Sequence, residues 1–145
     1  MKKIKLALVG CAGRMGQQII KELQKFSSID LIAALENKNS KFLHKKIKKI
    51  NITSDKELAF KEANTIIDFS QPESTLETVR YAAKLKKKLV IGTTGLNANQ
   101  VFKIKNASKK TAIVFAPNMS IGINLLMKFV GKASNILFSN NTSVE

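Results

Sequence analysis

The feature that most constrains the fold is a glycine-rich turn between an apolar segment and an amphipathic one. Residues 4–9 (IKLALV) form an almost uninterrupted apolar stretch, which is typical of a parallel strand covered on both faces. Residues 10–16 (GCAGRMG) follow at once. From Arg14 onward, apolar residues recur every three or four positions, as on the buried face of a helix. The sequence therefore predicts a strand, a glycine turn and a helix.

The same alternation continues along the chain. Further apolar runs predict strands at 30–35, 50–53, 65–69, 89–91 and 111–116. Helical spacing and helix-start residues predict helices that begin at Ser54, Pro72, Asn97 and Asn124, the last running to Phe138. Ser54 followed by Glu57 matches a capping box. Alternating strands and helices call for a parallel sheet with helices on both faces, so the predicted fold class is α/β and Rossmann-like.

The charge of the chain raises the question of a nucleic-acid partner. The 145 residues include 25 Lys and Arg against 10 Asp and Glu, a formal net charge of +15. Arginine is the residue that reads base edges and binds phosphates through two nitrogens. Of the 25 basic residues, only two are arginines, Arg14 and Arg80. The lysines lie between apolar positions, as on solvated helix faces. We therefore expect no nucleic-acid partner.

Cysteine and histidine are too scarce for several kinds of site. One Cys cannot form an internal disulfide, and neither it nor His44 belongs to a cluster of metal ligands, so we expect a cytoplasmic protein with no metal. His44 lies in the Lys-rich connection 37–49, where we expect a solvated surface residue. No segment approaches the roughly 18 apolar residues of a membrane span. We expect no membrane partner.

The chemistry-bearing residues begin with Gly10, Gly13 and Gly16, spaced G-x-x-G-x-x-G between the first strand and the first helix. Glycines let the backbone approach a pyrophosphate, and a helix N-terminus offers free N–H groups to it. A tight strand-to-helix turn would need the same glycines. Glu36, at the end of the second strand, is placed to accept hydrogen bonds from a ribose, which favours a dinucleotide site.

Two later loops lie where strands end, at the edge where open α/β sheets bind ligands. Residues 92–95 (GTTG) place two hydroxyls beside two glycines, and residues 116–119 (APNM) add a proline and an amide. Each loop also fits an ordinary turn. We take both as candidates for ligand contact.

These motifs resemble one known family along nearly the entire chain. The resemblance rests on VGCAGRMG, Glu36, IDFSQPEST, VIGTTG and APNMSIGINLL. The family is dihydrodipicolinate reductase, also called 4-hydroxy-tetrahydrodipicolinate reductase. The resemblance implies an NAD(P)-dependent oxidoreductase of lysine and diaminopimelate biosynthesis, in the bacterial cytoplasm. Its substrate is 4-hydroxy-tetrahydrodipicolinate and its product tetrahydrodipicolinate.

Carried over position by position, the resemblance implies a set of cofactor-binding residues. These are Gly10, Cys11, Ala12, Gly13, Arg14, Met15, Glu36, Gly92, Thr93, Thr94, Ala116, Pro117, Asn118 and Met119. Thr94 is also expected to face the substrate, and Cys11 to serve as packing within the loop. Residues 120–122 resemble a hinge, so we expect a dinucleotide-binding domain at 1–119 and the start of a substrate and oligomerisation domain at 120–145.

After the hinge the chain departs from its family. The family continues with a motif of a His-His pair and a Lys that hold a dicarboxylate substrate and supply a proton, and this motif does not occur between the hinge and Glu145. We therefore predict no catalytic residue in this chain and expect it to be inactive alone. The alternatives are a non-catalytic NAD(P)-binding module or the remnant of a split gene. Residues 139–143 are predicted to be turn-like, and Val144 and Glu145 to begin a further element.

Two further expectations concern partners. The family forms homo-oligomers, and the apolar face of the helix predicted at 124–138 is expected to make this chain self-associate. A dicarboxylate substrate is expected only if the missing domain is supplied. The cofactor is NAD or NADP, and we predict that NADH is preferred, because Asn37 stands where an Arg would neutralise a 2′-phosphate. Lys38 and Lys41 are expected to leave residual NADP(H) binding.

Overall fold

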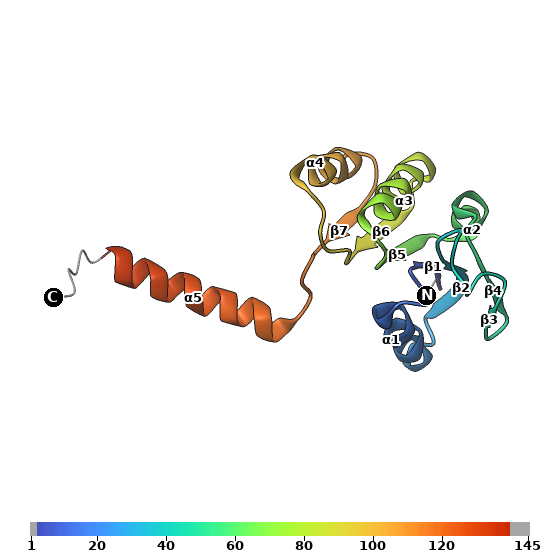
Figure 1. Ribbon diagram of the computed structural model, residues 1–145, viewed down its shortest axis with the longest axis horizontal. Helices are drawn as coiled ribbons and strands as arrows, with labels where there is room; N and C mark the ends of the chain where they lie inside the picture. The colour runs from blue at the N-terminus through green and yellow to red at the C-terminus, as the bar shows by residue number, and fades with distance from the viewer. Residues whose placement is uncertain (1–2, 140–145) are drawn as a thin grey trace.

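A computed structural model describes residues 3–139 of the chain. Its centre is a seven-stranded sheet in the order β3-β4-β2-β1-β5-β6-β7, in which only the β3–β4 pair is antiparallel (Figure 1). The strands are β1 (Ile4–Val9), β2 (Ile29–Leu35), β3 (Lys46–Ile47), β4 (Ile50–Thr53), β5 (Thr65–Asp68), β6 (Lys88–Ile91) and β7 (Ile113–Phe115). The prediction of a Rossmann-like parallel sheet is confirmed. β3 is an addition, in the connection predicted to be solvated.

The helices follow the predicted alternation. They are α1 (Arg14–Glu22), the short 3-10 helix η1 (Leu23–Lys25), α2 (Lys56–Glu62), α3 (Pro72–Leu85), α4 (Ala98–Ala107) and α5 (Ile121–Ser139). Pro72 occupies the first turn of α3, and Asn97 forms a full capping box at the start of α4. The capping box predicted at Ser54 is wrong. Asp55 caps α2 instead, because its carboxylate accepts a hydrogen bond from the Leu58 N–H at 2.9 Å.

Helices cover both faces of the sheet, with α2, α3 and α4 on one side and α1 on the other (Figure 1). The larger core cluster joins the sheet to the first group through Phe60 of α2, Val79 of α3 and Ile104 of α4, each nearly inaccessible to solvent. The smaller cluster lies around Leu8 and Cys11 and receives side chains of α1 and of the connection after β2. Each of these helices buries one face, as the sequence periodicity predicts.

Helix α5 is the exception, because it extends away from the sheet as a separate arm (Figure 1). It begins at Ile121, three residues before the predicted start. None of the residues from Ile121 to Phe138 is buried. By length and composition alone, this segment is long and apolar enough for a membrane span. The expectation that no segment approaches such a span is therefore wrong. Ser139 ends this helix instead of opening a turn. The remaining expectations for residues 140–145 lie outside the described residues.

Candidate cofactor site

The glycine turn after β1 packs closely against the backbone where β2 and β5 end. Gly10 has φ +79°, a left-handed conformation, and a Cβ there would lie 2.6 Å from the carbonyl oxygen of Phe69. The Gly10 N–H donates to the carbonyl of Leu35 at 3.0 Å. Gly16, in the first turn of α1, has no room either, since its Cβ would lie 2.7 Å from the Cα of Cys11. Packing alone therefore requires glycine at both positions.

The start of α1 has the properties of an anion site. Gly13 is the N-cap residue, no side chain caps the helix, and its first turn holds no acidic residue. The helix therefore presents backbone N–H groups and the positive end of its dipole at the mouth of the turn. A pyrophosphate fits this chemistry.

Glu36 lies directly beside this turn. Its backbone N–H continues the sheet by donating to the Thr53 carbonyl at 3.0 Å, and its half-buried side chain turns toward the loop. There the Glu36 Oε1 accepts a hydrogen bond from the Ala12 N–H at 2.7 Å. The structure thus places the predicted ribose carboxylate next to the predicted phosphate loop, with a contact to Ala12 that the sequence did not indicate. Its other lone pairs are the acceptors that ribose hydroxyls require.

Cys11 is fully buried within the same loop. Burial, and then the negative charge of Glu36, raise the pKa of its thiol to about 12. The group therefore stays protonated around neutral pH, whereas a nucleophilic or redox-active cysteine needs a thiolate. Its place in the smaller core cluster agrees with the predicted packing role.

A cavity of about 630 Å³ opens at the carboxyl edge of the sheet and joins the predicted loops. Its lining comprises Gly13, Arg14, Met15, Phe69, Ser70, Gly92, Thr93, Thr94, Ala116, Pro117, Asn118, Met119 and Ser120. Ten of the predicted cofactor residues are among them, from the ends of β1, β6 and β7. Such an edge, where strand ends from both halves of the sheet meet, is where open α/β folds bind ligands.

A second, smaller cavity of about 230 Å³ continues toward the other end of the loop. Gly10, Gly13, Glu36 and Asn37 line it. Of the predicted residues, Cys11 and Ala12 line neither cavity. The two cavities share Gly13, so they form one path from Glu36, past the start of α1, to the loops after β6 and β7.

Phe69 was missed by sequence reasoning, although it lies at the centre of this path and lines both cavities. Its N–H donates to the Val9 carbonyl at 3.1 Å, which ties the turn after β5 to β1. Its ring lies where a Cβ on Gly92 would be, so Gly92 provides the space that the ring occupies. An aromatic residue directly after an apolar strand was the available signal.

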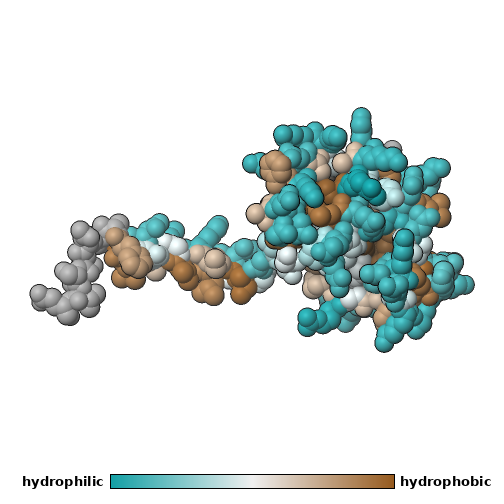
Figure 2. Space-filling model, turned by 45° about the horizontal axis from the view of Figure 1, so that its top comes forward, coloured by the Kyte–Doolittle hydropathy of each residue, from teal (hydrophilic) through white to brown (hydrophobic). Residues whose placement is uncertain are grey.

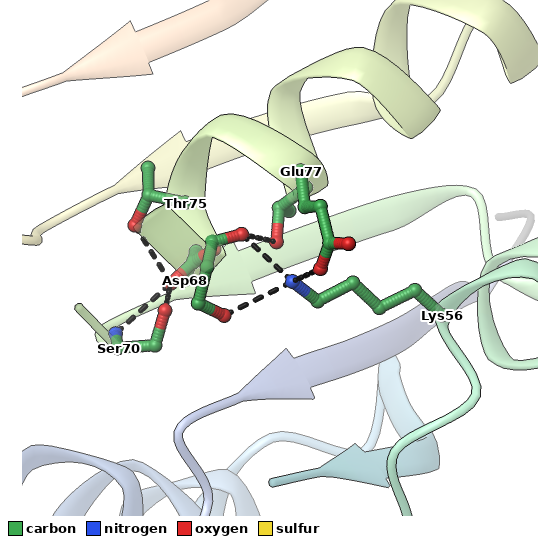
Figure 3. A network of polar contacts seen from close by, with 7 residues as sticks. Lys56, Asp68, Ser70, Thr75 and Glu77 are labelled. Carbon is green, nitrogen blue, oxygen red and sulfur yellow. Dashed lines mark hydrogen bonds and ion pairs between the residues drawn. The ribbon is translucent and has the colours of Figure 1, made fainter. Parts of the chain in front are cut away.

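Asp68, which sequence reasoning also missed, holds together the loops after β5 and β6 through hydrogen bonds. It is fully buried, and its Oδ1 accepts hydrogen bonds from the Ser70 N–H at 2.9 Å, the Ser70 hydroxyl at 2.6 Å and the Thr75 hydroxyl at 3.3 Å (Figure 3). The hydroxyls of Thr75 and Thr93 lie 2.7 Å apart. One carboxylate therefore fixes the turn after β5, the start of α3 and, through Thr93, the loop after β6. An acidic residue that ends an apolar strand, followed by hydroxyl residues, was the signal for it.

The remaining titratable residue considered in the sequence, His44, lies away from the two cavities. His44 is exposed in the connection after β2 and lines neither cavity. Within residues 3–139, no group of three or more His, Cys, Asp or Glu is placed to hold a metal ion. The described side chains around the path can bind and orient an anionic, extended ligand, with Glu36 at one end and small polar loops at the other.

Comparison with known proteins agrees with this arrangement. Residues 4–119 match the family described as dihydrodipicolinate reductase, N-terminus. The chain is 48% identical over 127 residues to the 4-hydroxy-tetrahydrodipicolinate reductase of Pelagibacter ubique, covering 88% of this chain and 48% of that protein. It is 41% identical to the enzyme of the same name from Buchnera aphidicola subsp. Cinara cedri, covering 96% and 54%.

A solved structure shows the same fold. Dihydrodipicolinate reductase from Paenisporosarcina sp. TG-14, bound to dipicolinate, matches with a TM-score of 0.76 and 24% identity, covering 91% of this chain and 54% of that chain. The chain spans about half the length of the curated relatives it matches. The likeness of fold thus extends over the sheet and the helices that flank it.

Proposed function

The chain belongs to the dihydrodipicolinate reductase family through its N-terminal domain, and from this we propose that it binds NAD(P)H as the cofactor half of a 4-hydroxy-tetrahydrodipicolinate reductase. The observation that carries the proposal is the continuous path between Glu36 and the loops after β6 and β7. A dinucleotide needs an acceptor for its ribose, an anion site for its pyrophosphate and a largely apolar pocket with a few polar groups for its nicotinamide. The path offers these in that order.

Different elements of the chain bind different parts of the cofactor in this proposal. The start of α1 binds the pyrophosphate through backbone N–H groups, and Glu36 accepts the ribose hydroxyls. Thr94 and Asn118 line the far end of the path, where they orient the nicotinamide. NAD(P)H supplies the hydride when it is bound. Asp68 and Phe69 hold the loops that shape this end.

We propose that the 145-residue chain binds the cofactor without turning over the substrate. Hydride transfer requires an acceptor held beside the nicotinamide, an acid for the developing charge and cations for the two substrate carboxylates. The cofactor path holds no His, and Arg14 is the single cation among the residues that line its two cavities. Fluorescence titration should show NADH binding, while NADH absorbance stays constant when 4-hydroxy-tetrahydrodipicolinate is added. A substrate-dependent loss of absorbance would overturn the inactivity, and an absence of binding would overturn the function.

We further propose that NADH is preferred over NADPH. Glu36 repels a 2′-phosphate, and Asn37 brings no positive charge to the position beside it. Lys38 is exposed, and a screened contact of this kind is worth less than about 1 kcal/mol. Competitive titration of the two reduced cofactors should favour NADH, and tighter NADPH binding would show that the lysines set the outcome.

The setting of this activity is also a proposal. Membership in a family of bacterial biosynthetic enzymes supports a cytoplasmic location and a dicarboxylate substrate that binds when the second half of the enzyme is supplied. The exposed apolar residues of α5 support self-association. A downstream reading frame that encodes a His-His pair and a Lys would favour a split enzyme. Nucleotide binding with no such partner would favour an NAD(P)-binding module.

A further inference from the structure

A third cavity, of about 450 Å³, lies on the other side of the ribose carboxylate. It begins at Glu36 and Asn37, at the end of β2, and extends between the starts of α2 and α3. Its charged lining consists of three carboxylates, Glu36, Glu73 and Glu77, and two ammonium groups, Lys38 and Lys56. A phosphate attached to a ribose hydroxyl at Glu36 would therefore meet surroundings with one excess negative charge.

Lys56 is the less exposed of the two cations, and its ammonium group is already bound. Its Nζ donates to the Ser74 carbonyl at 2.8 Å, the Ser74 hydroxyl at 3.0 Å and the Glu77 Oε2 at 2.8 Å (Figure 3). A lysine has three donors, so all of them are used. The Lys56 side chain is only 11% exposed, which holds the ammonium in this geometry.

Glu77 is the group that neutralises Lys56. The hydrogen bond and charge of Lys56 hold the pKa of the Glu77 carboxyl below its ordinary value, and the charges of Arg80 and Lys38 act in the same direction. Glu77 is therefore ionised throughout the neutral range. Lys38, the second cation of the cavity, is near enough to be attracted to it as well.

We propose that Glu77 is a second specificity-determining residue for the cofactor, which disfavours a 2′-phosphate by neutralising the Lys56 ammonium in the cavity beside Glu36. This inference rests on the proposed binding of the cofactor ribose at Glu36. Glu36 acts by direct repulsion, whereas Glu77 removes the counter-charge that would compensate for it. The preference for NADH thus has two separable origins. One is Glu36 at the end of β2, and the other is the pair of Lys56 on α2 and Glu77 on α3.

Glu77→Gln tests the proposal, because glutamine keeps an acceptor for Lys56 and removes only the charge. Glu77 is 58% exposed, so the exchange does not disturb the core. Calorimetric titration at low salt would compare NADH with NADPH, and 5′-AMP with adenosine 2′,5′-bisphosphate. We expect the preference for the unphosphorylated member of each pair to fall about three- to fivefold, and the change to shrink at high salt. Glu62→Gln, with the same change in charge at an exposed position outside this cavity, should leave both ratios within about twofold.

A double variant, Glu77→Gln with Lys56→Met, shows whether the relative gain in affinity for the 2′-phosphorylated ligands comes from Lys56. We expect this gain to disappear in the double variant, and its thermal midpoint is measured to verify folding. An unchanged ratio in Glu77→Gln, or a gain that persists without Lys56, would overturn the inference while leaving NADH binding intact. If the chain binds the AMP pair but neither dinucleotide, the nicotinamide part of the proposed function fails and the AMP ratios still decide the role of Glu77. Binding of none of the four would overturn both.

Discussion

The sheet domain, residues 3–119, and helix α5 use apolar residues in opposite ways. Helix α3 buries Val79 and Ala82 against the sheet and exposes its charged residues, so its apolar surface is hidden. Helix α5 is the more apolar of the two and leaves Phe129 and Leu137 61% and 66% exposed. Figure 2 shows the contrast as brown patches along the arm and a mostly teal domain. An exposed apolar helix face of this kind is the basis of the self-association proposed for α5.

The two regions also differ in what stabilises them. Helices of the sheet domain gain most of their stability from burial of one face, and a helix without tertiary packing lacks this contribution. Helix α5 has backbone hydrogen bonds, but none of its residues from Ile121 to Phe138 is buried. We therefore expect the sheet domain to unfold cooperatively and α5 to melt independently of it. Four matched experiments test this difference.

The largest effect is expected from alanine at two helical glycines. Gly16→Ala places a methyl group against the backbone of Gly10 and Cys11, which cannot move aside, and should cost about 3 kcal/mol of unfolding free energy. Gly131→Ala meets nothing within 4 Å and should stabilise α5 by up to about 1 kcal/mol. Urea unfolding followed by circular dichroism measures both. Equal effects at the two sites would contradict the comparison.

Thiol reactivity gives the next largest contrast. Below pH 9, Cys11 should react with a thiol reagent at least about a hundredfold more slowly than a cysteine introduced on α5 by Ala133→Cys, because its pKa is raised to about 12 and it is buried. The unfolded chain loses this proton near pH 9, so the folded state should lose stability as the pH rises above 9. Stopped-flow labelling would show one fast and one slow thiol. Two fast thiols would mean that the loop opens readily.

Self-association should respond to α5 and not to the domain surface. Phe129 and Phe102 have nearly equal exposure, 61% and 60%, but lie on α5 and α4. Phe129→Ser should weaken the self-association of the chain by about tenfold or more, because each buried phenylalanine contributes roughly 1.5 to 3 kcal/mol. Phe102→Ser should change it by less than about twofold. Analytical ultracentrifugation measures both, and a clean monomer of the unaltered chain at high concentration would contradict the proposal.

The smallest effects concern helix caps. Asn97 and Gln100 exchange two hydrogen bonds of 2.9 Å at the start of α4, so Asn97→Ala should cost about 1 kcal/mol. Ser120, at the start of α5, accepts from the Ile123 N–H at 3.4 Å, and Ser120→Ala should change domain stability by less than about 0.3 kcal/mol. Thermal melting distinguishes these values. A larger loss from Ser120→Ala would show that α5 is coupled to the sheet.

The sequence predicted those features that have a local signal. Strand and helix positions followed from periodicity, and the glycine turn and Glu36 followed from their spacing, because short segments determine both. The predicted cap at Ser54 failed by one residue, since Asp55 offers the same chemistry at the next position. Neighbouring capping residues cannot be distinguished by pattern alone.

Features that depend on pairing across the fold could not be predicted. Lys56 and Glu77 are 21 positions apart, and the hydroxyls of Thr75 and Thr93 are 18 apart. No periodicity links such residues. Their contacts depend on how α2, α3 and the loop after β6 meet, which packing of the complete sheet decides. The start of α5 was missed for a related reason, because apolar Ile121 and Ile123 sit in a loop-like segment rich in Asn, Ser and Gly.

The central position of β1 has a consequence for the order of events during synthesis. β1 leaves the ribosome before the other described strands, and one of its two neighbours, β5, arrives much later. The contact between the Lys5 N–H and the Asn64 side chain spans 59 positions. At typical rates of translation this is a wait of about 3 to 12 s. During that time an apolar strand has an open edge, which exposes the nascent chain to aggregation. The aggregation hazard therefore begins at β1, before α5 is made.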